Sequence, residues 1–257
     1  MLTSPEETMP DLYTLGTGAV VSDPDRTTTM LAISNDRATL LVDCGGDVAP
    51  RLQSVGLDPV GLGALIVTHE HADHVAGFPL LMERLWLMGR REPLPVYGIA
   101  PAIAQVQRVH DAFDTSDWVD YPGFTLHEIA LQPTAPVLDG AGWHVTASPG
   151  THAVPVVGLR FEDATSGHAL CYSSDTAPNA TITDLARGAQ LLVHEASGSG
   201  PVHTSAEQAA IIAKEAKVER LLLVHVPPRD MLAADLDAAR VVRPDVEVAC
   251  ELGRYPF

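Results

Sequence analysis

The stretch that most constrains this chain is ALIVTHEHADHVAG at residues 64–77. An apolar run ends there in a polar segment of six positions, which includes His69, His71, Asp73 and His74. Side chains alternate along a strand, so His69 and His71 project to the same side, and the turn into a following helix can aim all four at one small volume. Neutral imidazole and carboxylate are good ligands for Zn²⁺, Mn²⁺ or Fe²⁺. The stretch therefore predicts a metal site at the end of a buried strand; a polar loop with chance histidines is the alternative.

Three more side chains of metal-ligating type follow apolar runs later in the chain, each before a turn marked by Pro or Gly. They are His152 in SPGTHAVPVVG, Asp175 in CYSSDTAP and His225 in LLLVHVPPR. Any one of them alone is better explained as a capping or packing residue. Taken together with the first cluster, the order HxHxDH, His, Asp, His predicts a site with enough ligands for two cations.

The charge of the chain restricts its partners. The 257 residues carry 16 basic and 33 acidic side chains and a net charge of −17. Nucleic-acid binding gains most of its affinity when Lys and Arg replace the counterions of phosphates, so this balance argues against a nucleic-acid partner. Anionic membrane surfaces should repel the chain as well. No apolar run reaches the roughly 18 residues that a membrane span requires.

Strand-like and helix-like segments alternate along the chain, which predicts sheets covered by helices in a single domain over residues 1–257. Strands are expected in DLYTLGTG, MLAIS, ATLLVDCGG, LGALIVT, PLPVYG, FTLHEIAL, WHVTASP, VVGLRFED, HALCYSS, AQLLVHEA, RLLLVHV and DVEVAC. Helices are expected in VAPRLQSVG, FPLLMERLWLMGRR, PAIAQVQRVHDAF, ITDLARG, SAEQAAIIAKEAK and RDMLAADLDAAR.

The N-terminal sequence and the cysteines indicate a cytoplasmic protein. MLTSPEETMPDLY has two glutamates and no basic cluster before an apolar core, which argues against a signal peptide. The three cysteines, Cys44, Cys171 and Cys250, are far apart and form no CxxC, so neither a disulfide framework nor a thiolate zinc site is indicated. We therefore expect a reducing compartment.

The order of the histidines and aspartates resembles that of the metallo-β-lactamase superfamily. The resemblance implies an α/β (α+β) fold, a four-layer αβ/βα sandwich, with two divalent metal ions at one edge. Zn²⁺ is the first expectation for both ions, with Mn²⁺ or Fe²⁺ as alternatives. Asp43 in LLVDCGG matches an aspartate that supports the histidine loop without ligating a metal. By motif, Asp175 would bridge the two ions, and the other ligands would be His69, His71 and His152 on one and Asp73, His74 and His225 on the other.

Within the superfamily, the chain is most similar to the ribonuclease Z branch and its arylsulfatase and phosphodiesterase relatives. The similarity lies in LGTGA, in LLVDCGGDVAPRLQSVGLDP with ALIVTHEHADHVAGFPLLM, in THAVPVVGLR, in LLVHEAS with Ser197 in place of Thr, and in HTSAEQAAIIAKEAKVERLLLVHVPPR. It covers most of the chain and is weakest between Arg90 and Ala147. It implies a hydrolase that cleaves phosphodiesters.

The catalytic residues implied by this branch are Asp73, His203 and Glu195. Paired cations can acidify a water molecule and withdraw charge from a phosphoryl oxygen. The leaving alkoxide then needs a proton, which His203 would supply while Glu195 orients its ring, and Asp73 would also steer the attacking water. HTSAEQ can equally be a helix start capped by Thr204 or Ser205, and both roles can hold.

Two departures move the expected substrate away from tRNA. The tRNA-processing enzymes carry a long arm between the middle histidine and the bridging aspartate, but His152 and Asp175 are close enough in sequence for only two strands and a turn. The net charge of −17 is the second departure. We therefore expect a small-molecule ester substrate, helped by one or two cations that no motif selects among Arg26, Arg90, Arg91 and Arg229.

Several alternatives stay open at this point. The same metals could serve an arylsulfatase, a lactonase or another ester hydrolase; a true tRNA 3′-processing endonuclease and a metal-retaining protein without activity are further alternatives. Residues 78–122 hold much of the aromatic content. They could form an apolar lid over the metals, a core helix or the interface of a homodimer.

Overall fold

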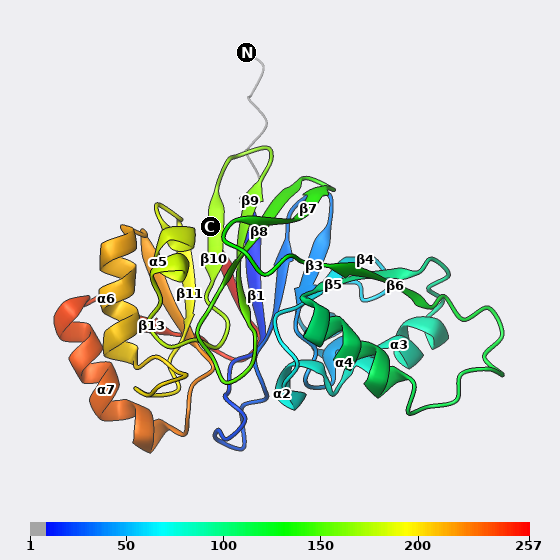
Figure 1. The fold of residues 1–257 in the computed structure, drawn as a ribbon, viewed down its shortest axis with the longest axis horizontal. Helices are drawn as coiled ribbons and strands as arrows, with labels where there is room; N and C mark the ends of the chain where they lie inside the picture. The colour runs from blue at the N-terminus through cyan, green and yellow to red at the C-terminus, as the bar shows by residue number, and fades with distance from the viewer. Residues whose placement is uncertain (1–8) are drawn as a thin grey trace, which may run out of the picture.

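The computed structural model describes residues 9–257, which form two seven-stranded sheets packed face to face (Figure 1). The first sheet has the order β14-β1-β2-β3-β4-β5-β6 and the second β13-β12-β11-β10-β9-β8-β7. The strands of the first sheet are β1 (Asp11–Gly16), β2 (Met30–Ser34), β3 (Thr39–Val42), β4 (Leu62–Val67), β5 (Leu94–Gly98), β6 (Phe124–Glu128) and β14 (Gly253–Pro256). Those of the second are β7 (Ala135–Gly140), β8 (Trp143–Pro149), β9 (Val157–Asp163), β10 (Ala169–Tyr172), β11 (Leu191–Glu195), β12 (Arg220–Val224) and β13 (Glu247–Val248).

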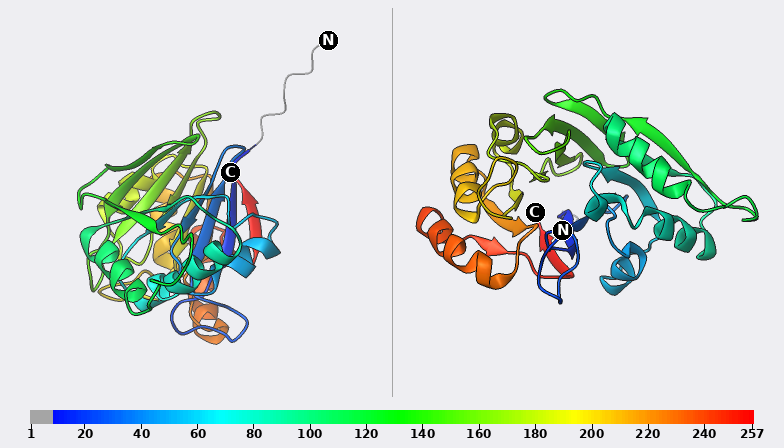
Figure 2. Two further views of the ribbon diagram at one scale, coloured as in Figure 1. Left: turned by 90° about the vertical axis from the view of Figure 1, so that its right-hand side faces the viewer. Right: turned by 60° about the horizontal axis from the view of Figure 1, so that its bottom comes forward.

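Helices cover the outer faces of both sheets (Figure 2). α1 (Val48–Ser54), α3 (Phe78–Leu87) and α4 (Ala100–His110) accompany the first sheet, and α2 (Ala72–Val75) is the short turn that carries the histidine motif. α5 (Ala180–Ala186), α6 (Ala206–Ala216) and α7 (Arg229–Val242) accompany the second. The predicted α/β fold, a four-layer αβ/βα sandwich, is confirmed.

Two apolar clusters hold these layers together. The larger cluster lies between the sheets and continues under α1, α3 and α4, with Trp143, Phe161 and Phe78 fully buried in it. The smaller one joins the second sheet to α5, α6 and α7 and contains many alanines, which let the helices approach the sheet closely. The interior strands β4 and β12 are buried over nearly their whole length, as strands of parallel pairs covered on both faces usually are.

The parallel strands bring their carboxyl ends to a common edge. β3, β4 and β5 are parallel in the first sheet, and β10, β11 and β12 are parallel in the second. Three residues that follow β3, β10 and β12 have a left-handed backbone: Asp43 (φ 59°), Ser174 (φ 54°) and His225 (φ 49°). Non-glycine residues adopt this conformation at a cost, and such residues cluster at functional sites. The sharp turns point to this edge as the site.

Gly45 places the loop after β3 directly against the histidine loop. A Cβ atom on Gly45 would lie 1.7 Å from the carbonyl oxygen of Asp73, far inside van der Waals contact. We therefore expect Gly45→Ala to destabilise the fold by about 3 kcal/mol or more, because both backbones would have to move. Urea unfolding measures this loss. Gly200→Ala is the control, since no atom lies within 4 Å of its Cβ position and its φ is not left-handed. A Gly45→Ala protein as stable as Gly200→Ala would contradict the described contact.

Most of the helices and strands predicted from the sequence are present. Three elements of the structure, α2, β7 and β14, were not predicted. α2 is only one turn long, and β7 and β14 are formed by sequences with Pro and Gly that carry little strand signal. β14 exists because its backbone pairs with β1. In residues 9–257 no helix is both long and apolar enough to cross a membrane. Residues 1–8, which include most of the segment used to argue against a signal peptide, lie outside the described residues.

Candidate metal centre

The structure brings all seven predicted metal-ligating side chains to one place at the carboxyl edge of the strands. His69, His71 and His152 form the first group: His71 Nδ1 lies 3.2 Å from His69 Nε2 and 3.1 Å from His152 Nε2. Nitrogen ligands of a tetrahedral zinc ion, at about 2.0–2.1 Å from the metal, are roughly 3.3 Å apart. The three nitrogens are therefore already at ligand spacing.

The second group consists of Asp73, His74 and His225, with Asp175 between the two groups. Asp73 Oδ2 lies 3.6 Å from His74 Nε2 and 3.5 Å from His225 Nε2. Asp175 Oδ2 lies 3.2 Å from His225 Nε2, 3.6 Å from His74 Nε2 and 3.9 Å from His69 Nε2. One carboxylate oxygen thus faces both groups, as the predicted bridging role of Asp175 requires.

Four of the histidines are held by their second nitrogen, which leaves Nε2 free to point into the cluster. The hydrogen bond made by Nδ1 fixes the tautomer and the ring orientation, as is usual for metal-ligating histidines. The partners of Nδ1 are Thr68 Oγ1 for His69 (3.1 Å), Asp43 Oδ2 for His74 (2.8 Å), the Val202 carbonyl oxygen for His152 (2.9 Å) and Ser197 Oγ for His225 (2.6 Å).

Two buried polar atoms in the cluster have no hydrogen-bond partner among the described residues, His74 Nε2 and Asp175 Oδ1. A buried polar atom without a partner costs roughly 1–3 kcal/mol, so such atoms are rare. Both atoms belong to predicted ligands, and a divalent cation would satisfy them. The donor set, its spacing and these two atoms fit the metal ions that the sequence predicts.

Without a bound cation the imidazoles of the cluster differ in protonation, and metal binding would release the proton that carboxylates hold on His74. Burial lowers the pKa of His69, which keeps its imidazole neutral. Burial acts in the same direction on His74, but Asp175 and Asp43 together raise its pKa well above the usual range. Burial acts to raise the pKa of Asp175, but His225 and His74 hold it well below the usual range. The buried carboxylates thus stabilise positive charge within the cluster, and a divalent cation would take the place of the protons on the imidazoles.

Next to the cluster, Glu195 and His203 form the pair that was predicted to be catalytic. Glu195 is fully buried at the end of β11, and its Oε1 accepts a hydrogen bond of 2.9 Å from His203 Nδ1. The same carboxylate accepts backbone N–H groups of Thr176 and Ser197 at 2.9 and 3.0 Å, which fixes its orientation. The hydrogen bond to Glu195 raises the pKa of His203. The His203 ring centroid lies 4.9 Å from that of His152.

The helix-start interpretation of HTSAEQ is confirmed. Ser205 Oγ accepts the backbone N–H of Gln208, and the side chain of Gln208 accepts the backbone N–H of Ser205, a capping box at the start of α6. The cap leaves His203 outside the helix. One short segment therefore both starts α6 and places an imidazole beside the metal cluster.

The four arginines considered for substrate binding are engaged elsewhere in the protein. Arg90 is buried and donates to the carbonyl oxygens of Val60 and Leu62, which makes it structural. The other three arginines each bind protein groups: Arg26 the Ala249 carbonyl oxygen, Arg91 that of Arg90, and Arg229 the carboxylates of Asp23 and Asp25.

The aromatic segment 78–122 divides between core and surface. Phe78 is fully buried, which agrees with the core interpretation of α3. Trp86 stacks on Trp118 at 4.7 Å between ring centroids and donates to the Val119 carbonyl oxygen. These contacts fix the 112–121 loop on α3. A hollow of approximately 320 Å³ between α3 and this loop is lined by residues outside the predicted ligand set.

Sequence reasoning missed the residues that hold the histidines. Thr68 immediately precedes the histidine motif, and its N–H donates to Asp43 Oδ1 at 2.8 Å while its hydroxyl contacts His69. Ser197 was noticed only as a replacement for Thr. Its position in LLVHEAS was the available signal, since a hydroxyl is present in either case. The Val202 carbonyl gave no signal, because any residue supplies one.

Asp43→Asn tests the support of His74. Asp43 accepts from Thr68 N and from His74 Nδ1 with different oxygens. If the oxygen of the introduced amide accepts from Thr68, its NH₂ faces His74 and favours the tautomer that protonates Nε2. We expect metal affinity to fall by about 10–100-fold, as for other losses of such support. Competition with a chromophoric chelator measures this, and Asp47→Asn, an exposed aspartate paired with Arg84, is the control. Equal affinity of the two variants would contradict the role of Asp43.

Known proteins resemble this chain over nearly its full length. Residues 38–226 match the family described as beta-lactamase superfamily domain. A ribonuclease Z from Methanothermobacter thermautotrophicus is 27% identical over 95% of both chains. Among solved structures, the metallo-beta-lactamase fold protein YhfI from Bacillus subtilis has a TM-score of 0.80 at 24% identity and covers 98% of this chain and 100% of its own. The short form of human tRNase Z has a TM-score of 0.79 at 22% identity and covers 95% and 98%.

A four-layer sandwich with a histidine and aspartate cluster at the ends of its parallel strands defines a hydrolase that depends on divalent metal ions. The family match covers well over half of the sequence, so the chain belongs to the beta-lactamase superfamily. The predicted resemblance to the ribonuclease Z branch is confirmed by relatives that match almost end to end.

Proposed function

We propose that this protein is a phosphodiesterase of the ribonuclease Z type, in which His203 protonates the leaving alkoxide. The observation that carries the proposal is the Glu195–His203 pair beside the metal cluster. An ester with a good leaving group needs only activated water, whereas an alkoxide leaving group needs a proton. A buried carboxylate that orients an imidazole, 2.9 Å between Oε1 and Nδ1, is the arrangement suited to that proton transfer.

Two divalent ions would be held by the seven residues, most simply zinc, since imidazole and carboxylate ligands suit it. His69, His71 and His152 would hold one ion, Asp73, His74 and His225 the other, and Asp175 would bridge them. When bound, the ions supply Lewis-acid activation of water and of the phosphoryl group.

The protein groups supply orientation and the proton. Glu195 accepts from Nδ1 of His203, so Nε2 faces away from Glu195 and holds the proton that goes to the leaving oxygen. The buried carboxylate stabilises the imidazolium before the transfer, in agreement with the raised pKa of His203. Burial acts to raise the pKa of Asp73, but its hydrogen bond to His225 and neighbouring imidazoles lower it, which keeps Asp73 an acceptor that can orient the attacking water.

The preferred substrate is a small phosphodiester. A net charge of −17 opposes the approach of a polyanion, and the candidate arginines are bound to protein groups. The connection between β9 and β10 is a short turn, so no long arm extends between His152 and Asp175. The second candidate is precursor tRNA, which the names of the ribonuclease Z and tRNase Z relatives favour.

A substrate panel on metal-loaded protein separates these functions. The panel contains bis(4-nitrophenyl) phosphate, a nucleoside aryl phosphate, an aryl sulfate, a lactone and precursor tRNA, with chelator-treated protein as the control. We expect the two phosphodiesters to be hydrolysed with the highest kcat/KM. A higher kcat/KM for the sulfate or the lactone would contradict the proposed function and indicate an arylsulfatase or a lactonase. Cleavage of precursor tRNA at physiological salt would establish the second candidate.

We also propose that the chain acts in the cytoplasm as a single-domain protein and forms a homodimer. The apolar surface of α3 and the 112–121 loop supports self-association, since Leu87, Phe113 and Val119 are 69%, 59% and 77% exposed. Sedimentation velocity tests the dimer. A monomer at all concentrations up to roughly 100-fold above those of the assay would contradict it, since a dimer dissociates by mass action only on dilution.

A further inference from the structure

A hollow lined by apolar side chains opens directly beside His203 and His225. It has a volume of approximately 260 Å³, and Ser197 joins the two histidines in its lining. We name its apolar part the collar, which consists of Ala19, Val20, Val21, Pro227, Pro228 and Met231. Val20, Val21 and Met231 are 72%, 68% and 67% exposed. Large apolar side chains grouped beside a reactive site indicate a surface that an apolar group covers.

The collar is held in place from both sides. Val20 and Val21 lie on the loop after β1, and Met231 lies in the first turn of α7. Arg229 joins the two elements, because its guanidinium lies 2.7 Å from Asp25 Oδ2 and 3.2 Å from Asp23 Oδ2. The backbone N–H of Ala19 donates to the Val226 carbonyl oxygen at 3.0 Å. The apolar surface is thus preformed, which reduces the entropy lost on binding.

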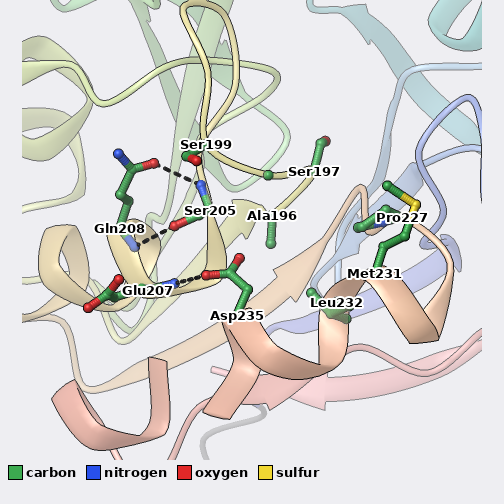
Figure 3. A pocket seen from close by; sticks show the side chains of 11 residues that line it. Ala196, Ser197, Ser199, Ser205, Glu207, Gln208, Pro227, Met231, Leu232 and Asp235 are labelled. Atoms are coloured by element: carbon green, nitrogen blue, oxygen red, sulfur yellow. Dashed lines mark hydrogen bonds between the residues drawn. The ribbon is translucent and has the colours of Figure 1, made fainter. Parts of the chain in front are cut away.

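Beyond the collar lies a second pocket of approximately 520 Å³, which shares Ser197, Pro227 and Met231 with the hollow (Figure 3). Figure 3 shows Met231 and Pro227 on one side of this pocket and the carboxylates of Glu207 and Asp235 on the other. Arg229 directly follows the collar residue Pro228 in the chain. Its charge is neutralised by the carboxylates of Asp23 and Asp25. The surroundings of the collar therefore disfavour a second negative charge on the bound group.

The geometry points to a specificity site for the leaving group: we propose that the collar binds the group whose departing oxygen His203 protonates. We propose that this group carries no further charge and is apolar, an aryl or short alkyl group. The inference rests on the proposed function, since it assigns the leaving-group side of the same reaction. The size agrees, because a cavity of about 150 Å³ accommodates a benzene ring, and 260 Å³ leaves room for a substituent.

The kinetic test uses methyl aryl phosphodiesters whose leaving phenols carry either alkyl or carboxylate substituents. For each series, log kcat/KM is plotted against the pKa of the leaving phenol. The two series are then compared at equal pKa of the phenol. We expect alkyl-substituted substrates to exceed carboxylate-substituted ones by about tenfold, the effect of covering one apolar side chain. The double variant Val20→Ser/Val21→Ser should lose this preference, with little change for the carboxylate series. Val241→Ser is the control, since Val241 is on the same helix as Met231, is 86% exposed and lies outside the hollow.

A second readout does not depend on turnover. Saturation-transfer NMR with 4-ethylphenol, on both metal-depleted and zinc-loaded protein, should show transfer to the ligand for the native chain and for Val241→Ser, and little transfer for the double variant. Circular dichroism checks that each variant is folded.

The outcomes separate the inference from the proposed function. Loss of both alkyl preference and phenol binding in the double variant supports the collar. If the native protein hydrolyses phosphodiesters but the double variant keeps its alkyl preference, the collar assignment is wrong and the proposed function stands. If zinc-loaded native protein hydrolyses none of the phosphodiesters, the proposed function fails and the assignment of a leaving-group site fails with it.

Discussion

Replacing Asp175 by Asn is expected to lower kcat/KM by about a thousandfold or more and to reduce the number of tightly bound metal ions. Asp175 Oδ2 is the atom that faces both histidine groups, and no other carboxylate of residues 9–257 takes that position. The amide is neutral and a weaker ligand, so it would not balance the charge of two cations. A thousandfold loss corresponds to about 4 kcal/mol of transition-state stabilisation, within the several kcal/mol that metal ions contribute.

The measurement pairs elemental analysis after gel filtration with kinetics on bis(4-nitrophenyl) phosphate. Asp163→Asn is the matched control, because Asp163 is also a buried aspartate, 3% exposed, but caps the turn after β9 through Ser166 and Asn35. Its folded fraction should keep full metal content and activity. An Asp175→Asn protein with unchanged metal content and kcat/KM would exclude a bridging role for Asp175.

Replacing His203 by Ala is expected to lower kcat/KM by about 10²–10⁴-fold for phosphodiesters with an alkyl leaving group, the usual contribution of a general acid. The effect should be less than about tenfold for a 4-nitrophenyl leaving group, because nitrophenolate departs without a proton. The dependence on leaving group follows from the geometry: His203 lies beside the cluster and is held by Glu195, yet belongs to neither predicted ligand group.

Two further variants isolate this role. His127→Ala removes an exposed histidine of β6 that contacts Thr125, and should leave both substrates unaffected. Glu195→Gln should reduce activity on the alkyl substrate by a smaller factor, since the ring keeps a partner but loses the stabilising charge. Equal losses on alkyl and nitrophenyl substrates in His203→Ala would show that His203 acts on metal binding or folding and not as an acid.

The histidine and aspartate cluster could be predicted because it depends on two features that the sequence shows, the type of each residue and its position after an apolar run. Burying histidine and aspartate at the end of an apolar strand costs free energy unless these side chains find polar or metal partners. Parallel strands of one sheet end at the same edge, which brings such residues together. The same pattern predicts His152, Asp175 and His225 as ligands from the sequence alone. The capping box of α6 was foreseeable for a similar reason, since Ser205 and Gln208 have the required spacing.

Other contacts could not be foreseen, because they depend on pairing between distant segments. Arg229 was a candidate for substrate binding, but the structure places it against Asp23 and Asp25, more than 200 positions earlier in the sequence. β14 has little intrinsic strand tendency and forms because β1 presents a free edge to it. The collar was not recognised either, since Val20, Val21 and Met231 become neighbours only in the folded chain.

The division of the cluster between the two sheets has a consequence for how the protein acquires its ions. The loop with residues 69–74 follows β4 of the first sheet, while Asp175 and His225 follow β10 and β12 of the second. Neither sheet alone supplies the full proposed ligand set of either ion, because His152 also follows a strand of the second sheet, β8. Tight binding of an ion would therefore require the two sheets to be folded and docked, and a bound ion would in turn stabilise the contact between them.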